Sequence, residues 1–219
     1  MSAPTLSYYD TMSQLPEDTV VIWHHVSWEE YEELLEQVGE ASGLRISFDD
    51  GTLQAVTLST EHEKYVRFIE RVVSTLSLRL RVRTLAFGST TMKKRKQRKG
   101  NEPDACFYVQ TAAALGNRIH LDFTLDPPPD IAVEVDVHHD SLSKFPIDVA
   151  LGVPEIWRYD GGQMRIHQLR HEAYVEVESS PALPMLTSRI LTEYLTRMRE
   201  EGEFDTLLAF DEWLGALPR

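Results

Sequence analysis

The sequence predicts a mixed α/β (α+β) protein, in which a mixed β-sheet core is flanked by helices. Residues 131–137, IAVEVDV, alternate apolar and polar positions as strand residues do. Residues 60–76 instead place apolar side chains at the three- and four-residue spacing of a helix face. The length suits one domain, 1–219, with a polar N-terminal extension at 1–19 and a C-terminal helical appendage at 187–219.

Capping boxes and one turn dipeptide define the N-terminal half. Ser27 with Glu30, and Thr60 with Glu63, have the spacing by which a side chain and a backbone N–H cap each other at a helix start. Asp50-Gly51 tolerates the positive φ values of a tight hairpin turn. The expected elements are a strand at 20–26, a helix from Ser27 to about Gly39, hairpin strands at 44–48 and 52–58, and a helix from Thr60.

Glycine and proline divide the C-terminal half. Gly152 and Pro154 end a helix that Asp140-Ser141 can cap, Gly161-Gly162 forms a turn, and Gly202 separates one or two final helices. The expected elements are strands at 81–87, 104–109 and 131–137, a helix from Asp140 to Leu151, an antiparallel meander at 155–159, 164–168 and 173–178, and helices within 187–219.

The composition excludes several classes of protein. With 42% hydrophobic residues the chain is not disordered, and its longest uncharged stretch, residues 105–117, is too short to span a membrane. The first twenty residues lack Lys and Arg, so no ordinary signal peptide is expected. Cys106 is the single cysteine, which excludes an internal disulfide and a cysteine-based zinc site and favours the cytoplasm.

The net charge of −13 is unevenly distributed. Residues 93–99, KKRKQRK, hold six of the 22 basic residues, which leaves −19 for the remainder. Such a run is typical either of a loop that contacts phosphates or of a solvated surface loop. The candidate nucleic-acid contacts are Lys93, Lys94, Arg95, Lys96, Arg98 and Lys99.

Four carboxylates are candidates for a metal site. Asp130, Glu134 and Asp136 point to one side of the strand at 131–137. If the strand at 104–109 pairs with it in antiparallel fashion, Asp104 lies next to Glu134 and Asp136. Such carboxylates suit Mg²⁺ or Mn²⁺, and Lys144 can reach the same place from the following helix. The alternative is a half-exposed strand with its polar side chains in water.

An ordered set of segments resembles the Uma-type putative restriction endonuclease family of the PD-(D/E)xK nuclease superfamily. The resemblance covers roughly residues 25–195. The segments are Trp28-Glu-Glu-Tyr31-Glu, Ser59-Thr-Glu-His62-Glu-Lys-Tyr65, Gly88-Ser-Thr-Thr91, Glu102-Pro-Asp104, Pro129-Asp-Ile-Ala-Val-Glu134-Val-Asp136 and Ala150-Leu-Gly-Val-Pro-Glu155-Ile-Trp157-Arg-Tyr-Asp160. The resemblance implies a restriction-endonuclease-like sheet, a Mg²⁺-dependent acid cluster and a homodimer.

Carried over to this chain, the resemblance assigns Asp104 and Glu134 as the two metal ligands. The position of the family's E-x-K lysine is Asp136 here, and Lys144 is a candidate replacement. His62 matches a recurrent histidine and either lines the site or caps and packs the helix start.

These observations predict a Mg²⁺-dependent endonuclease that hydrolyses DNA phosphodiester bonds. Two alternatives stay open. One is a catalytically inactive nuclease fold that serves as a binding or assembly module, which the absent E-x-K lysine favours. The other is a nuclease acting on RNA or on structured DNA.

Overall fold

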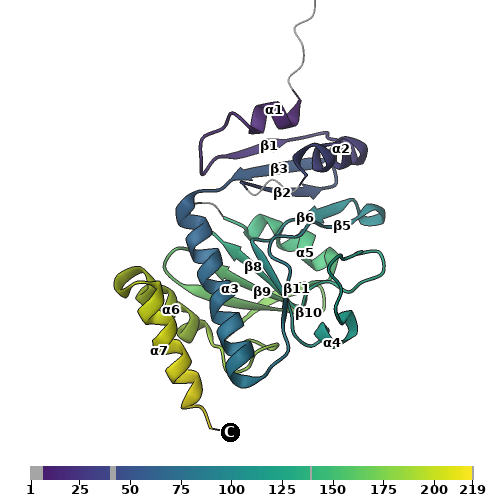
Figure 1. The fold of residues 1–219 in the computed structure, drawn as a ribbon. Coiled ribbons are helices and arrows are strands. Elements are labelled where there is room, and N and C mark those ends of the chain that lie inside the picture. The colour runs from purple at the N-terminus through teal and green to yellow at the C-terminus, as the bar shows by residue number, and fades with distance from the viewer. Residues whose placement is uncertain (1–6, 40–42, 139, 219) are drawn as a thin grey trace, which may run out of the picture.

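The computed structural model describes residues 7–39, 43–138 and 140–218, which form two β-sheets flanked by helices (Figure 1). The first sheet is antiparallel throughout. Its strands, in spatial order, are β1 (Val20–Trp23), β3 (Thr52–Thr57), β2 (Leu44–Asp49), β6 (Lys99–Asn101) and β5 (Met92–Lys94).

The second sheet is mixed, as the sequence predicts. Among the described residues, β8 and β9 are the one parallel pair in this sheet, and the expected antiparallel meander of β9, β10 and β11 is confirmed. Its strands, in spatial order, are β11 (Ala173–Val177), β10 (Met164–Arg170), β9 (Glu155–Tyr159), β8 (Ile131–Val135), β7 (Ala105–Tyr108) and β4 (Leu85–Ala86).

Helices cover both sheets (Figure 1). The helices α1 and α2 accompany the first sheet, and α3 runs along the second sheet. Helix α7 packs against α3 and α6, and α6 also packs against β10. The α-helices are α1 (Tyr8–Met12), α2 (Trp28–Val38), α3 (Thr60–Leu80), α4 (Ala112–Leu115), α5 (Phe145–Leu151), α6 (Ser188–Glu201) and α7 (Glu203–Gly215), with 3₁₀ turns at Arg95–Gln97 and Leu142–Lys144. Within the described part of the chain, no helix combines the length and apolar character that crossing a membrane requires.

The helix start follows the capping signal at α2, whereas the cap of α3 and the start of α5 differ from those expected. At α2 the Ser27 hydroxyl accepts the backbone N–H of Glu30, and the Glu30 carboxylate accepts that of Ser27 at 2.7 Å, so this capping box is confirmed. At α3 the cap is Ser59, one residue before the expected Thr60, and its hydroxyl accepts the N–H of His62 at 3.3 Å. The cap places His62 in the first turn of α3. The helix expected from Asp140 begins as α5 at Phe145, with Lys144 as its N-cap and no side-chain capping hydrogen bond.

The central strand β8 is buried on both faces, so the alternative of a half-exposed strand with its polar side chains in water is wrong. Ile131, Val133 and Val135 face the main core with α3, α6 and α7. On the opposite face Ala132 packs with side chains of α5. Glu134 shares this second face, which means that its carboxyl group is buried between β8 and α5.

Three regions differ from the sequence expectation. The strand expected at 81–87 is reduced to the two residues of β4. The basic run is a hairpin, β5 and β6 joined by a 3₁₀ turn, and it belongs to a separate first sheet. Met12, within the expected polar extension, is buried against the first sheet, and α6 and α7 contribute Leu191 and Phe210 to the main core.

Candidate active site

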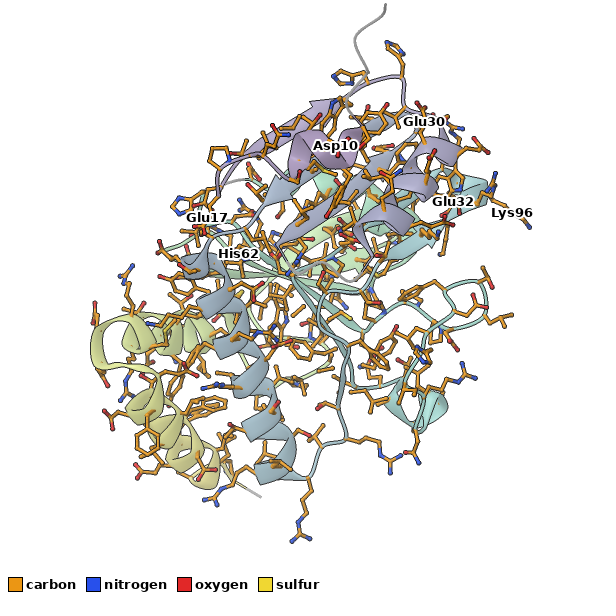
Figure 2. All side chains as sticks on the ribbon, turned by 45° about the horizontal axis from the view of Figure 1, so that its top comes forward. Asp10, Glu17, Glu30, Glu32, His62 and Lys96 are labelled. Atoms are coloured by element: carbon orange, nitrogen blue, oxygen red, sulfur yellow. The ribbon has the colours of Figure 1, made fainter. Side chains whose placement is uncertain are left out.

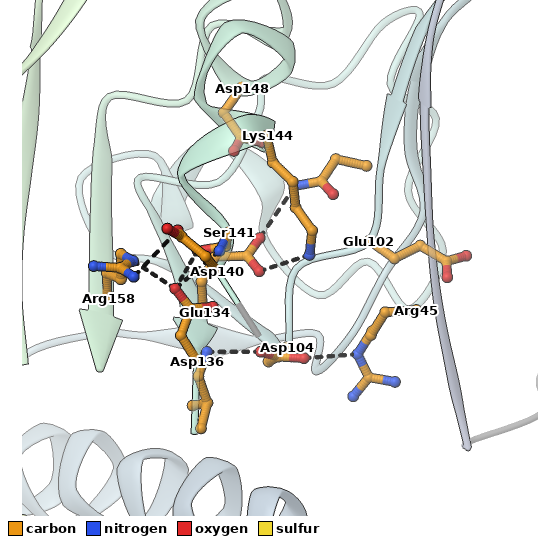
Figure 3. A network of polar contacts seen from close by, with 12 residues as sticks. Arg45, Glu102, Asp104, Glu134, Asp136, Asp140, Ser141, Lys144, Asp148 and Arg158 are labelled. Atoms are coloured by element: carbon orange, nitrogen blue, oxygen red, sulfur yellow. Dashed lines mark hydrogen bonds and ion pairs between the residues drawn. The ribbon is translucent and has the colours of Figure 1, made fainter. Parts of the chain in front are cut away.

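Asp104, Glu134 and Lys144 meet between the first sheet and β8 (Figure 3). Extending the antiparallel register of β7 and β8 by one residue places Asp104 opposite Glu134, which confirms the predicted neighbourhood. Lys144 is the N-cap residue of α5. The three side chains are 5%, 2% and 9% exposed. Together with His62 they line a cavity of about 30 Å³, which has room for about one water molecule.

Asp104 is held by hydrogen bonds and charges on both oxygens. Its Oδ1 accepts Nε of Arg45 at 3.0 Å. Its Oδ2 accepts the backbone N–H of Val135 at 2.8 Å and lies 3.0 Å from Nε2 of His62. Burial by itself raises the pKa of Asp104, but His62, Arg45 and Lys144 outweigh burial, and the pKa is lowered. Asp104 is therefore ionised at neutral pH. Its contact with Nε2 also places the His62 side chain in the cluster.

Glu134 faces Lys144 at the end of β8. Its Oε2 accepts Nζ of Lys144 at 2.9 Å, and its Oε1 accepts Nδ2 of Asn101 at 3.2 Å. The pKa of Glu134 is raised to about 8: burial raises it most, Lys144 opposes that rise, and Asp104 and Asp148 add to it. Burial alone lowers the pKa of Lys144, but Glu134 and Asp104 dominate and raise it. Lys144 is thus charged, and Glu134 binds a proton more readily than an ordinary glutamate.

Asp136, at the position of the E-x-K lysine, lines the cavity but is bound by other groups. Its Oδ2 accepts the backbone N–H and the hydroxyl of Ser141, both at 2.9 Å, and pairs with Nε of Arg158 (Figure 3). Burial raises the pKa of Asp136, while Ser141 and Arg158 oppose that shift. Asp136 therefore ties the segment before Lys144 to β8 and β9.

Asp130, which the sequence analysis names as a candidate metal ligand, does not lie in the cluster. It precedes β8, at the opposite end from Glu134. Its Oδ2 accepts the backbone N–H of Val109 at 2.7 Å, and the N–H and hydroxyl of Thr111 at 3.0 and 2.9 Å. Shared parity places two residues on one face of a strand, but it does not bring the two ends of the strand together.

Most of the basic hairpin is engaged within the protein. Lys94 donates to the carbonyl of Leu151 at 2.7 Å, at the end of α5. The ion pairs join Lys93 and Arg95 to Glu32, Arg95 to Glu29, Arg98 to Asp50, and Lys99 to Asp49. Lys96 has no ion pair with any residue that the structure describes, and it extends outward beyond Glu32 (Figure 2). Glu29 and Glu32 on α2 therefore form ion pairs with Lys93 and Arg95, two of the candidate nucleic-acid contacts.

Sequence reasoning missed three residues of the cluster. Arg45 comes from β2 and Asn101 from β6, both in the first sheet, and Asp148 comes from α5. Nδ2 of Asn101 donates to Oδ1 of Asp148 at 2.9 Å as well as to Glu134. The resemblance motifs include none of these positions. Arg45 and Asp148 stand between apolar residues, which is a weak signal of burial, whereas the neighbours of Asn101, a glycine and a glutamate, give no such signal.

The donor set of Asp104 and Glu134 fits a small divalent cation. Both supply carboxylate oxygens, the ligands that Mg²⁺ prefers, and Mg²⁺ commonly binds only one or two protein carboxylates. Among residues 7–39, 43–138 and 140–218, no three His, Cys, Asp or Glu side chains form a ready metal cluster. The positive charge near these two carboxylates comes instead from Arg45 and Lys144.

Comparison with known proteins gives a consistent result. Residues 28–197 match the model of the Uma2 family, described as putative restriction endonucleases. The fold is similar to the crystal structure of a putative nuclease belonging to DUF820 from Anabaena variabilis ATCC 29413, with a TM-score of 0.53 and 12% sequence identity. That match covers 78% of this chain and 99% of the other. No curated protein matches the chain.

Proposed function

Because the chain belongs to the Uma2 family of putative restriction endonucleases, we propose that it is a Mg²⁺-dependent endonuclease that hydrolyses DNA phosphodiester bonds. The observation that carries the proposal is the pairing of Asp104 with Glu134 across β7 and β8, with Lys144 2.9 Å from Glu134. An ionised carboxylate, a second carboxyl group and a buried ammonium are the groups that phosphodiester hydrolysis requires in one place.

Asp104 and Glu134 would hold the metal ion. When bound there, Mg²⁺ supplies a Lewis acid that polarises the scissile phosphate and lowers the pKa of the attacking water. Arg45 and His62 keep the Asp104 carboxylate in place. Lys144 presents an ammonium that stabilises the negative charge developing on the phosphate.

Lys144 takes the role of the E-x-K lysine from a different element. The residue two positions after Glu134 is Asp136, whose carboxylate binds Arg158 and Ser141. The lysine instead enters from the start of α5 and reaches Oε2 of Glu134. The ammonium therefore lies next to the same metal-binding carboxylate, although its place in the sequence differs.

Cleavage of plasmid DNA tests this proposal. We expect cleavage by the purified protein with Mg²⁺ and none with EDTA. Glu134→Gln and Asp104→Asn should each abolish cleavage while the protein stays folded, as measured by circular dichroism. The matched control is Glu172→Gln, at an exposed position between β10 and β11, which should cleave like the wild type. Full activity in both cluster variants would overturn the assignment.

A catalytically inactive binding or assembly module is the second candidate function. The absent E-x-K lysine and the ion pairs that already occupy the cavity favour it. Isothermal titration calorimetry separates the two functions, since the inactive module binds no Mg²⁺ at millimolar concentration.

Cleavage of RNA or branched DNA in preference to the plasmid would instead assign a different substrate. Light scattering tests the homodimer that the family resemblance implies.

A further inference from the structure

Asn101 is a fully buried amide at the junction of the two sheets. It is the last residue of β6, in the first sheet, and pairs with Met92 of β5 and Ser47 of β2. Its carboxamide nitrogen reaches out of that sheet and donates to Glu134 at 3.2 Å and to Asp148 at 2.9 Å. A side chain from the basic hairpin therefore contacts the candidate metal ligand.

The contact completes the hydrogen bonding of Glu134. Lys144 binds Oε2 and Asn101 binds Oε1, so that both oxygens of the carboxyl group are held. The two donors differ in charge. An ammonium competes electrostatically with a metal ion for the carboxylate, whereas a neutral amide orients the carboxylate and leaves its negative charge available.

Asp148 fixes the orientation of the amide. The two N–H groups of a carboxamide can serve two acceptors, and here both acceptors are carboxyl groups. When Glu134 is ionised, as metal binding requires, and Asp148 is ionised too, a flipped amide would direct its carbonyl oxygen at two carboxylates, which is repulsive. The orientation with the nitrogen toward both carboxylates is then the favourable one. Asp148 is fully buried on α5, the helix whose N-cap is Lys144.

The arrangement leaves two oxygens unsatisfied. Among the described residues, Oδ1 of Asn101 and Oδ2 of Asp148 are buried without a hydrogen-bond partner. Buried polar atoms without partners destabilise a fold, and an apolar pair could pack β6 against α5 instead. Unlike an apolar pair, this amide and carboxyl group provide the hydrogen bond from Asn101 to Glu134.

We propose that Asn101 is a positioning residue that holds Glu134 in its metal-binding orientation, and that Asp148 acts through Asn101 by fixing the carboxamide. The inference rests on the proposed function, because it takes Glu134 as a metal ligand. It also joins the basic hairpin to the metal site, since β6 carries Asn101 at one end and Lys99 at the other.

The first test is the Mg²⁺ affinity of Asn101→Leu, which removes the amide and keeps the volume. We expect the dissociation constant for Mg²⁺, measured by calorimetry, to rise roughly tenfold to a hundredfold, as for other groups that orient a metal ligand. Cleavage at saturating Mg²⁺ should recover more than cleavage at low Mg²⁺, which a general loss of structure would not produce. Asn117→Leu, at an exposed position, is the matched control and should bind Mg²⁺ like the wild type.

Two variants of Asp148 separate its positioning role from a role of its charge. Asp148→Asn keeps an oxygen that can accept from Asn101, so we expect a Mg²⁺ affinity within about threefold of the wild type. Asp148→Leu removes that acceptor and should weaken Mg²⁺ binding as Asn101→Leu does. An equal loss in Asp148→Asn and Asp148→Leu would overturn the positioning role of Asp148.

Wild-type Mg²⁺ affinity in folded Asn101→Leu overturns the inference. If Asn101→Leu does not fold, the smaller Asn101→Ala is measured in its place, with the same criterion. Glu134→Gln is titrated in parallel. If Glu134→Gln binds Mg²⁺ as tightly as the wild type, the proposed metal site has failed; if it loses binding and the Asn101 variants do not, only the positioning role has failed.

Discussion

The buried cluster and the basic hairpin both concentrate charge, but the two regions differ in exposure and in what their charges contact. Asp104, Glu134 and Lys144 are at most 9% exposed, and cations face carboxyl groups at about 3 Å. In the hairpin, Lys93 and Arg95 are 40% and 60% exposed and pair with carboxylates of α2. Charge density along a sequence therefore does not identify the charges that matter most energetically.

Burial sets the strength of these interactions. An exposed ion pair contributes about 0.2–1 kcal/mol to stability, because water and salt screen it. Removing one partner of a buried pair costs about 3–5 kcal/mol, because the remaining charge stays desolvated. The two regions should therefore respond very differently to the loss of a single charge.

The largest effect is expected for Lys144→Met. This change removes the ammonium beside Glu134 and should reduce the rate of DNA cleavage at least ~100-fold, the size typical of a lost electrostatic stabiliser of the transition state. Single-turnover cleavage at saturating Mg²⁺ measures it. Lys64→Met, at an exposed position on α3, is the control, and a Lys144→Met rate within a few fold of the control would contradict the proposed role.

A large effect on stability is expected for Arg45→Met. Asp104 loses the guanidinium that binds its Oδ1 at 3.0 Å and keeps its buried position. The free energy of unfolding should fall by about 3 kcal/mol in urea titrations at pH 7. A loss below about 1 kcal/mol would mean that His62 and the backbone N–H of Val135 satisfy Asp104 by themselves.

A moderate effect is expected on the pH dependence of stability. The pKa of Glu134 is about 8 in the folded protein against 4.5 ordinarily, so the folded state binds more protons between these pH values. The free energy of unfolding should therefore decline as pH rises from about 4.5 to 8. Glu134→Gln removes this titration, and its decline should be shallower. Parallel curves for the two proteins at pH 5, 6, 7 and 8 would contradict the pKa shift.

The smallest effect on stability is expected for Arg95→Gln in the hairpin. Both of its ion pairs are largely exposed, so the free energy of unfolding should change by less than about 1 kcal/mol.

Neutralising all six cations of the hairpin should weaken DNA binding and reduce the salt dependence of that binding, because fewer counterions are released. An unchanged salt slope would assign the hairpin to the solvated surface.

Pairing along one sheet was predictable from the sequence, whereas packing between sheets was not. Alternation identified the strand that carries Glu134, and its antiparallel neighbour placed Asp104 beside it. Arg45 and Asn101 belong to the other sheet, and their contacts depend on how β2 and β6 lie over β8. No local pattern encodes that arrangement.

The sequence also did not predict where Asp130 lies along its strand, or which distant residues pair with the basic run. Asp130 shares the parity of Glu134, but it lies at the other end of β8 and caps the turn at Thr111. The basic run was identified as a cluster of cations, while its partners Glu29 and Glu32 come from a helix more than sixty residues earlier. Their pairing required the first sheet to bring α2 beside the hairpin.

The central claim is that the buried cluster, rather than the hairpin, is where a divalent cation binds and the chemistry occurs. Crystals soaked in millimolar Mn²⁺ and measured at the manganese edge test it most directly. We predict an anomalous peak in contact with carboxylate oxygens of both Asp104 and Glu134. A map with no peak there, in which Arg45 and Lys144 still pair with these two carboxylates, would contradict the claim.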